Sequence, residues 1–149
     1  MRFAVGIALL AGFGCTGTEE LDGHTHSTDD ESDCASAEDF VVGLQKSTPA
    51  GVVVTLIDAT PAPPYRGVNA WTIGLTDSGA APIPDATLTV TPWMPLHNHG
   101  LVPPDYTGTG NAAGVYIVAP FELTMPGQWE FTVDAGDGDS VKYIFCVEG

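Results

Sequence analysis

Basic side chains are scarce in this chain. Its 149 residues include 4 Lys and Arg against 19 Asp and Glu, so the formal net charge is −15. Nucleic acids and anionic lipid surfaces are bound through clustered Lys and Arg. The composition therefore excludes both kinds of partner, and it is compatible with the attraction of cations.

The chain also lacks an apolar run long enough to cross a membrane as a mature helix. The run from Phe3 to Phe13 follows a single basic residue, Arg2, and ends just before Cys15. This pattern is typical of an export signal. The cysteine indicates a bacterial lipoprotein signal, residues 1–15, in which Cys15 is lipidated and becomes the mature N-terminus. Ordinary signal cleavage is the alternative.

We therefore expect a protein of the bacterial cell envelope, held at the periplasmic face or in the outer membrane. The only contact with the membrane is expected to be the lipid anchor. Another envelope protein is a possible partner.

Cysteine is rare as well, with three in the chain. With Cys15 assigned to lipid, Cys34 and Cys146 remain, and an exported protein can form a disulfide. We predict a bridge between them, which closes a loop of 146 − 34 = 112 residues. Metal binding by two free thiols is the alternative, but neither has a near-neighbour cysteine or histidine.

The segment 16–39 has no Lys or Arg and nine acidic residues, and Leu21 is its only large aliphatic residue. Such a segment buries too little apolar surface to offset the entropy of ordering it. We interpret it as a flexible acidic tether. Its two histidines, His24 and His26, could loosely hold a divalent metal, although solvated side chains are the simpler interpretation.

Helical periodicity is missing from the rest of the chain, where strand-like runs alternate with turn residues. The runs span 40–46, 51–59, 68–77, 85–92, 114–123, 128–135 and 140–148. Several alternate between apolar and polar residues, as an antiparallel sheet with one buried face does. The apolar positions predicted to share one core are Trp71, Ile73, Leu75, Leu88, Val90, Trp129, Phe131 and Val133.

This pattern predicts an all-β domain over residues 40–149, specifically an immunoglobulin-like antiparallel β-sandwich of about seven strands. A small antiparallel barrel is the competing architecture.

Enzyme motifs are missing too. There is no G-x-S-x-G nucleophile elbow and no phosphate-binding glycine loop. The stretch "DAGDGDS", 134–140, has three aspartates but lacks the glutamate that closes an EF-hand loop, so we expect a hairpin turn there. We predict that the protein is not an enzyme.

Histidine and methionine are few but gathered: "PWMPLHNHG", 92–100, holds Met94, His97 and His99. The prolines favour an extended, stiffened loop, in which residues two apart point the same way. Imidazole binds Cu, Zn and Ni, and a thioether favours Cu(I). Met125, in a second Met-Pro pair, is a candidate fourth ligand. The stretch therefore predicts a copper site.

A structural role for the same stretch stays open. Trp93, Met94 and Leu96 could close one end of the sandwich. The two histidines would then hydrogen-bond the following loop through Asp105 and Tyr106.

Three motifs in order carry a resemblance to a known family. They are W-M-P-x-H-x-H-G at 93–100, G-x-Y at 114–116 and M-x-G-x-W at 125–129. Over roughly residues 40–149 the chain resembles the YtkA-like/FixH-like domain group, and most of all its exported bacterial lipoprotein members.

The resemblance implies a small, exported, sandwich-like domain. FixH-like proteins are associated with cation handling and with the assembly of copper-containing respiratory oxidases. Carried over to this chain, the resemblance singles out Met94, His97 and His99, with Met125 as the further candidate. The lipoprotein-type signal replaces the transmembrane helix of FixH-like proteins, which weakens the case for oxidase assembly.

Two functions follow from the sequence. The first is a lipid-anchored envelope protein that binds a copper ion for buffering or transfer. The alternative is a metal-free structural or interaction module of the envelope with the same fold.

Overall fold

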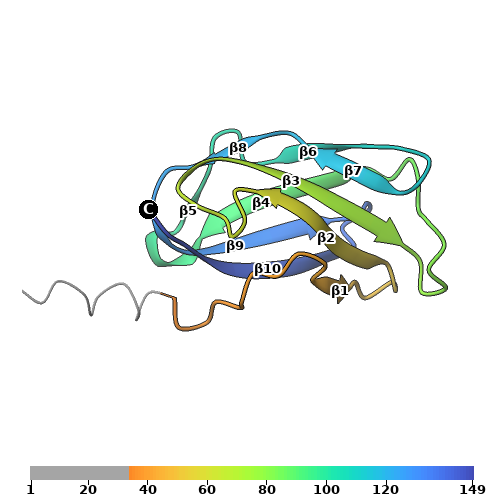
Figure 1. Ribbon diagram of the computed structural model, residues 1–149, viewed down its shortest axis with the longest axis horizontal. Coiled ribbons are helices and arrows are strands. Elements are labelled where there is room, and N and C mark those ends of the chain that lie inside the picture. Colours follow the sequence, from red (N-terminus) through yellow and green to blue (C-terminus); the bar gives the residue numbers. More distant parts are fainter. Residues whose placement is uncertain (1–33) are drawn as a thin grey trace, which may run out of the picture.

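The computed structural model describes residues 34–149 (Figure 1). The expected signal peptide with Cys15, and residues 16–33 with His24 and His26, lie outside the described residues. Within the described part of the chain, no helix is both long and apolar enough to span a membrane.

The domain consists of ten strands and one short 3₁₀ helix. The strands are β1 Gln45–Ser47, β2 Val53–Thr60, β3 Gly67–Thr76, β4 Leu88–Met94, β5 His99–Gly100, β6 Tyr106–Gly110, β7 Val115–Val118, β8 Phe121–Leu123, β9 Gly127–Asp134 and β10 Ser140–Val147, and the helix is η1 Pro95–His97. All named strand pairs are antiparallel. The all-β antiparallel class is therefore confirmed.

The strands form one continuous sheet in the order β1-β2-β3-β7-β6-β4-β9-β10, with β5 beside β4 and β8 beside β3. Ten strands are more than the seven predicted, and they do not separate into two sheets. The sheet curls into a nearly closed barrel (Figure 1). Glu38 helps to close it, because its amide donates to the Ile144 carbonyl at 2.8 Å and its carboxylate accepts from the Ile144 amide at 2.8 Å.

The barrel interior holds all eight residues predicted for the core, each at most 1% exposed. They occupy the inward phase of β3, β4 and β9, where successive side chains alternate between the two faces of the strand. Trp71 lies at the centre of an aromatic cluster with Phe121, Phe131 and Phe145. The prediction from alternating apolar residues is confirmed here.

Pro92 contradicts an expectation, because it lies inside β4, a central strand, opposite Phe131 of β9. On the other side of β4 the ladder is interrupted: β6 pairs as far as Val90, and β5 resumes at Trp93. A proline at that gap removes no ladder hydrogen bond. The strand therefore continues through the proline as far as Met94.

The predicted disulfide is present, with Cys34 and Cys146 joined and their Cα atoms 5.4 Å apart. Cys146 is the register partner of Gln128 on β9, and the Gln128 side chain accepts from the Ser36 amide at 3.1 Å. Residues 34–39, assigned to the tether from the sequence, thus contact the barrel. The domain begins at Cys34 because the bridge fixes the chain there.

The barrel has two distinct ends. One, called the histidine end below, gathers the end of β4, η1, β5, the β2–β3 loop, the start of β9 and the end of β10 (Figure 1). The other, called the acidic end, gathers the β9–β10 hairpin and the segments that flank β3 and β4 there. The stretch 134–140 forms that hairpin, as predicted.

Candidate functional site

The candidate site is built on the turn that joins β4 to β5. Met94 ends β4, Pro95 opens η1, and His99 starts β5, with Met94 and His99 as register partners. In such an antiparallel pair the two Cβ atoms lie about 5 Å apart on one face of the sheet. Met94 and His99 therefore belong to the inner face, and Trp93 belongs to the outer one.

The turn itself differs from the extended loop that was expected. Residues 95–97 form a 3₁₀ turn, and Asn98 then takes a left-handed conformation, φ 53° and ψ 43°. The Asn98 amide donates to the Pro95 carbonyl at 3.2 Å. The two imidazole rings come together, with centroids 5.9 Å apart, because the chain reverses at Asn98 and not because an extended chain alternates.

The two histidines differ in their surroundings. His97 is exposed, whereas His99 is half-buried and its ring meets the Trp129 indole edge-on, with centroids 6.3 Å apart. His99 Nδ1 lies 3.2 Å from the Gly100 carbonyl oxygen. With the proton on Nδ1, that nitrogen donates to the carbonyl, and Nε2 keeps a free lone pair for a metal.

The two methionines lie near the start of β9. Met94 is 1% exposed, and its methyl group abuts Gly127, where an added Cβ would lie 2.9 Å from it. Met125 is partly buried against the core, and its carbonyl oxygen accepts from the Trp129 indole N–H at 3.0 Å. Of the two, Met94 is tied to the histidines by its register pairing with His99.

The structural alternative for this stretch is only partly met. Met94 is buried, but Trp93 and Leu96 are exposed and do not close the barrel end. The Asp105 carboxylate accepts from the Thr91 hydroxyl, and the His99 contact is with the backbone of Gly100. The expected pairing of the histidines with Asp105 and Tyr106 is therefore not what the geometry shows.

The donor set limits which metal could bind. The described residues contain no group of three His, Cys, Asp or Glu that could hold a metal ion. Two imidazoles with thioether sulfur are what the histidine end offers. Imidazole with thioether sulfur suits copper better than zinc, which is held by thiolate, imidazole and carboxylate. Magnesium and calcium are held by oxygen ligands.

The ring separation is compatible with a shared ion. A metal about 2.0 Å from one nitrogen of each ring lies roughly 3.2 Å from each centroid, so the centroids are then at most roughly 6.4 Å apart. The observed 5.9 Å falls within that limit. The distance alone therefore allows both rings to reach one ion.

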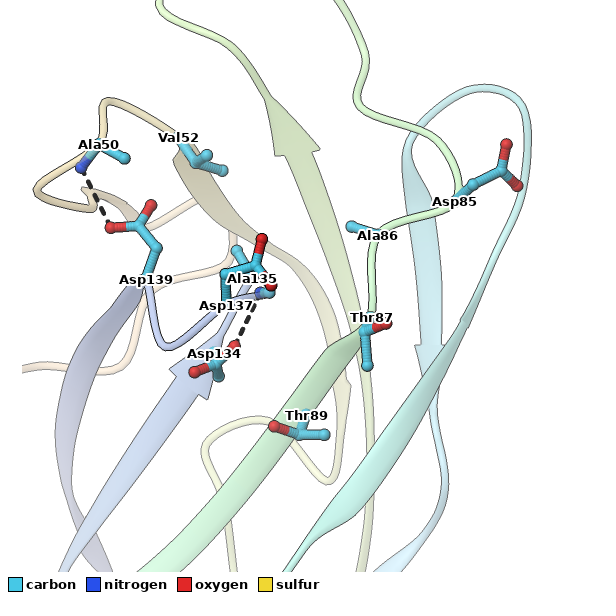
Figure 2. Close-up of a pocket in the computed structure, with 11 residues that line it drawn as sticks. Ala50, Val52, Asp85, Ala86, Thr87, Thr89, Asp134, Ala135, Asp137 and Asp139 are labelled. Atoms are coloured by element: carbon cyan, nitrogen blue, oxygen red, sulfur yellow. Dashed lines mark hydrogen bonds between the residues drawn. The ribbon is translucent and has the colours of Figure 1, made fainter.

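A hollow of about 680 Å³ opens at the acidic end (Figure 2). It is lined by Ala50, Val52, Asp85, Ala86, Thr87, Thr89, Asp134, Ala135, Gly136, Asp137 and Asp139. Asp139 accepts from the Thr48 hydroxyl and from the Ala50 amide, and Asp134 accepts from the Gly136 amide. These two carboxylates are engaged in holding turns, so the hollow is not assigned as a site.

Sequence reasoning missed the part that Gly127 and Trp129 play around the methionines and His99. Both residues belong to the Met-Pro-Gly-Gln-Trp motif at 125–129, of which only Met125 was predicted as a site residue. The spacing of the motif was therefore a usable signal.

Comparison with known proteins gives one result. The family model described as YtkA-like matches residues 46–134, from β1 to the end of β9. The match includes β4, η1, β5 and the start of β9, and it ends before β10 and Cys146. Among curated proteins, no significant match to this chain is found.

Proposed function

Because this chain belongs to the YtkA-like family and brings two histidine rings together at one end of its barrel, we propose that it binds a copper ion at His97 and His99, for buffering or transfer. The 5.9 Å between the ring centroids is the observation that carries this proposal. We further propose that the protein works in the bacterial cell envelope, anchored through lipid at Cys15.

The ligands divide into an outer and an inner pair. His97 and His99 supply imidazole nitrogen from the rim, and Met94 supplies thioether sulfur from the inner face, with Met125 as the candidate fourth ligand. Sulfur favours Cu(I), whereas two imidazoles also accept Cu(II). A bound copper ion, in either oxidation state, would supply coordination positions at which one ligand can be replaced by another.

Exposure of His97 bears on transfer. A ligand on the surface can leave the metal and be replaced by a donor from an acceptor molecule, whereas a fully enclosed metal cannot be reached. The half-buried His99 and the buried Met94 would retain the ion during that exchange. This arrangement suits a protein that gives its metal away.

Protonation sets the pH dependence of the proposed binding. A protonated imidazole cannot bind a metal. Copper affinity should therefore fall as the pH is lowered.

A competition titration of the full chain with a Cu(I)-chelating dye tests the proposal. Replacing both histidines, His97→Ala with His99→Ala, should abolish tight binding. Met94→Leu keeps the core volume and should weaken Cu(I) binding more than Cu(II) binding. The matched control, His24→Ala with His26→Ala, should bind as the parent does.

The alternative function is a metal-free interaction module, and the exposed Trp93 and Leu96 beside the histidines favour it. The same titration separates the two functions. A parent chain that binds copper no more tightly than an unrelated acidic protein would support the interaction module.

A further inference from the structure

We infer that the histidine end of the barrel docks on a neutral, zwitterionic lipid bilayer. The inference rests on the proposed lipid anchor for bringing the domain to the membrane. It adds a second membrane contact to the anchor, which was expected to be the only one. The docking face itself is defined by residues of the described domain.

Exposed apolar side chains gather at this end. Of the nine exposed large hydrophobic residues in the described chain, five lie here: Tyr65, Val68, Trp93, Leu96 and Val102. Val102 is 96% exposed, and Trp93 exposes 38% of its surface. Exposed apolar residues that gather in one region mark interaction sites more often than scattered ones do.

The strand register places these five residues at one end of the barrel. Tyr65 bridges Glu148, just past the end of β10, and Val68 is the second residue of β3, opposite Glu122 of β8. Trp93 pairs with Gly100, and Val102 lies two residues later, in the bend that follows β5.

Leu96 completes the set, at the centre of η1. Exposed apolar residues thus occur in the β2–β3, β4–β5 and β5–β6 connections, or in the strands next to them, at the same end of the barrel.

Charged residues are also distributed unevenly between the two ends of the barrel. Residues 92–104 include no Asp, Glu, Lys or Arg, in a chain with a net charge of −15. The charged residues at the histidine end are Arg66, Asp105, Glu122, Glu148 and Glu130, which is the register partner of Trp93 and forms an ion pair with Lys142. The acidic end has Asp77, Asp85, Asp134, Asp137 and Asp139, and neither Lys nor Arg among its described residues.

The segment 92–104 of the histidine end is therefore uncharged, whereas the acidic end is ringed by carboxylates. Carboxylates are costly to remove from water, so a bilayer surface would take up the segment 92–104 and not the acidic end. The lack of clustered basic residues points to zwitterionic and not anionic lipid.

The preceding chain joins the domain at the same end. Cys34 is bonded to Cys146, beside the start of β9, so the described chain begins at the histidine end (Figure 1). An anchor at Cys15 is 34 − 15 = 19 residues away along the chain. That attachment points the apolar end, and not the acidic end, towards the membrane.

A tether also explains why a small apolar patch would be enough. Linking two interactions turns the second into an intramolecular event at a high effective concentration. Tryptophan is favoured at the membrane interface, where its amphipathic ring lies at headgroup depth. Trp93 is thus the side chain expected to enter the interface first.

The tryptophans provide the test, because Trp71 and Trp129 are at most 1% exposed and Trp93 is the accessible one. The full chain is mixed with phosphatidylcholine vesicles that contain dibrominated phosphatidylcholine, a fluorescence quencher within the bilayer. We expect the Trp93 emission to be quenched, and Trp93→Phe to remove the quenchable component.

Matched variants locate the contact. Leu96→Ser with Val102→Ser should lower the quenching at least twofold. Val42→Ser with Ile117→Ser, which removes two exposed apolar residues from the turn before β1 and from β7, should leave it unchanged.

Sedimentation of the same samples separates docking from anchoring. A chain that sediments with the vesicles while Trp93 stays unquenched would overturn the docking and leave the anchor intact, and a protein partner would then be the occupant of this face. A chain that does not sediment would overturn both proposals.

Discussion

Asn98 determines where the two imidazoles lie. Its left-handed conformation reverses the chain between η1 and β5, so His97 and His99 approach each other at a turn. Asparagine tolerates this region because its short polar side chain adds little steric conflict, whereas a β-branched residue does not. The site depends on a residue that is not itself a ligand.

Replacing Asn98 should separate geometry from ligand chemistry. Asn98→Val should destabilise the domain by about 1–2 kcal/mol and weaken copper binding, because valine resists the left-handed conformation. Asn98→Gly accepts that conformation and should keep parental affinity. Urea denaturation and dye competition provide the two measurements. Equal copper affinity in the valine and glycine variants would show that the turn does not position the histidines.

Tyr143 shows how burial affects the dependence of stability on pH. Burial, and then the negative charge of Glu38, raise the pKa of its hydroxyl, which donates to the Val54 carbonyl at 2.9 Å. Below about pH 10 tyrosine is protonated in both states, so this stabilisation is fully present. Above it the unfolded chain ionises while the folded one keeps its proton, so stability falls with rising pH.

The corresponding variant is Tyr143→Phe. It should lose about 1 kcal/mol at neutral pH, because the hydrogen bond to Val54 is gone. Its loss of stability between pH 9 and 11 should be shallower than that of the parent, though not absent, because burial also raises the pKa of Tyr106. Urea denaturation at several pH values measures both effects. Identical slopes for parent and variant would contradict the assignment to Tyr143.

The strands show which parts of the fold were predictable. Runs with large alternating residues, such as β9, were assigned correctly, and their core positions are buried. β6, "YTGTG", was missed because two glycines in five residues are typical of a loop. The run 114–123 was predicted as one strand. It divides into β7 and β8, with Pro120 between them and Phe121 as the first residue of β8, and β8 pairs with β3.

The β6 glycines have a packing role that composition does not reveal. A Cβ on Gly110 would lie 2.3 Å from the Tyr116 ring, and one on Gly108 would lie 2.6 Å from Leu88. Tyr116 cannot easily move, because its hydroxyl donates to the Ile83 carbonyl and accepts from the Ala86 amide. β6 can therefore form a strand here because its glycines leave room for the Tyr116 ring and the Leu88 side chain.

Gly110→Ala tests this packing. Overpacking against a fixed ring should cost about 1–3 kcal/mol. Gly79→Ala, in a turn where the nearest obstacle is the Asp77 carboxylate, should cost much less. Thermal or urea unfolding compares the two. Equal and small effects would mean that Tyr116 yields more readily than its hydrogen bonds indicate.

The site was less predictable than the fold. The residue types in "PWMPLHNHG" correctly indicated that two histidines lie together, but the reason given, an extended chain, was wrong. A 3₁₀ turn with a left-handed residue depends on how β4 and β5 pair, and that pairing is set by contacts distant in sequence. The copper ligands, the lipid anchor and the location in the envelope stay predictions.

The disulfide joins the two ends of the domain in sequence and fixes where the preceding chain attaches. The loop between Cys34 and Cys146 spans 112 residues. In the chain-entropy model, a disulfide that closes a loop of this length raises the free energy of unfolding by at most roughly 4–5 kcal/mol.

Replacing both cysteines by alanine should lower the free energy of unfolding by about 2–4 kcal/mol. Reductant should destabilise the parent by a similar amount and leave the double variant unaffected. Urea denaturation with and without dithiothreitol measures this. If reductant leaves the free energy of unfolding of the parent unchanged, the bridge does not restrict the conformations of the unfolded chain.

The central claim is that one copper ion joins the two histidines to methionine sulfur at the histidine end. The X-ray absorption spectrum of the full chain loaded with one equivalent of Cu(I) tests it most directly. We predict imidazole nitrogen and thioether sulfur around copper. The imidazole signal should be lost in the variant with His97→Ala and His99→Ala, and kept in the variant with His24→Ala and His26→Ala. An unchanged spectrum in the first variant, or one without sulfur in the parent, would contradict the account.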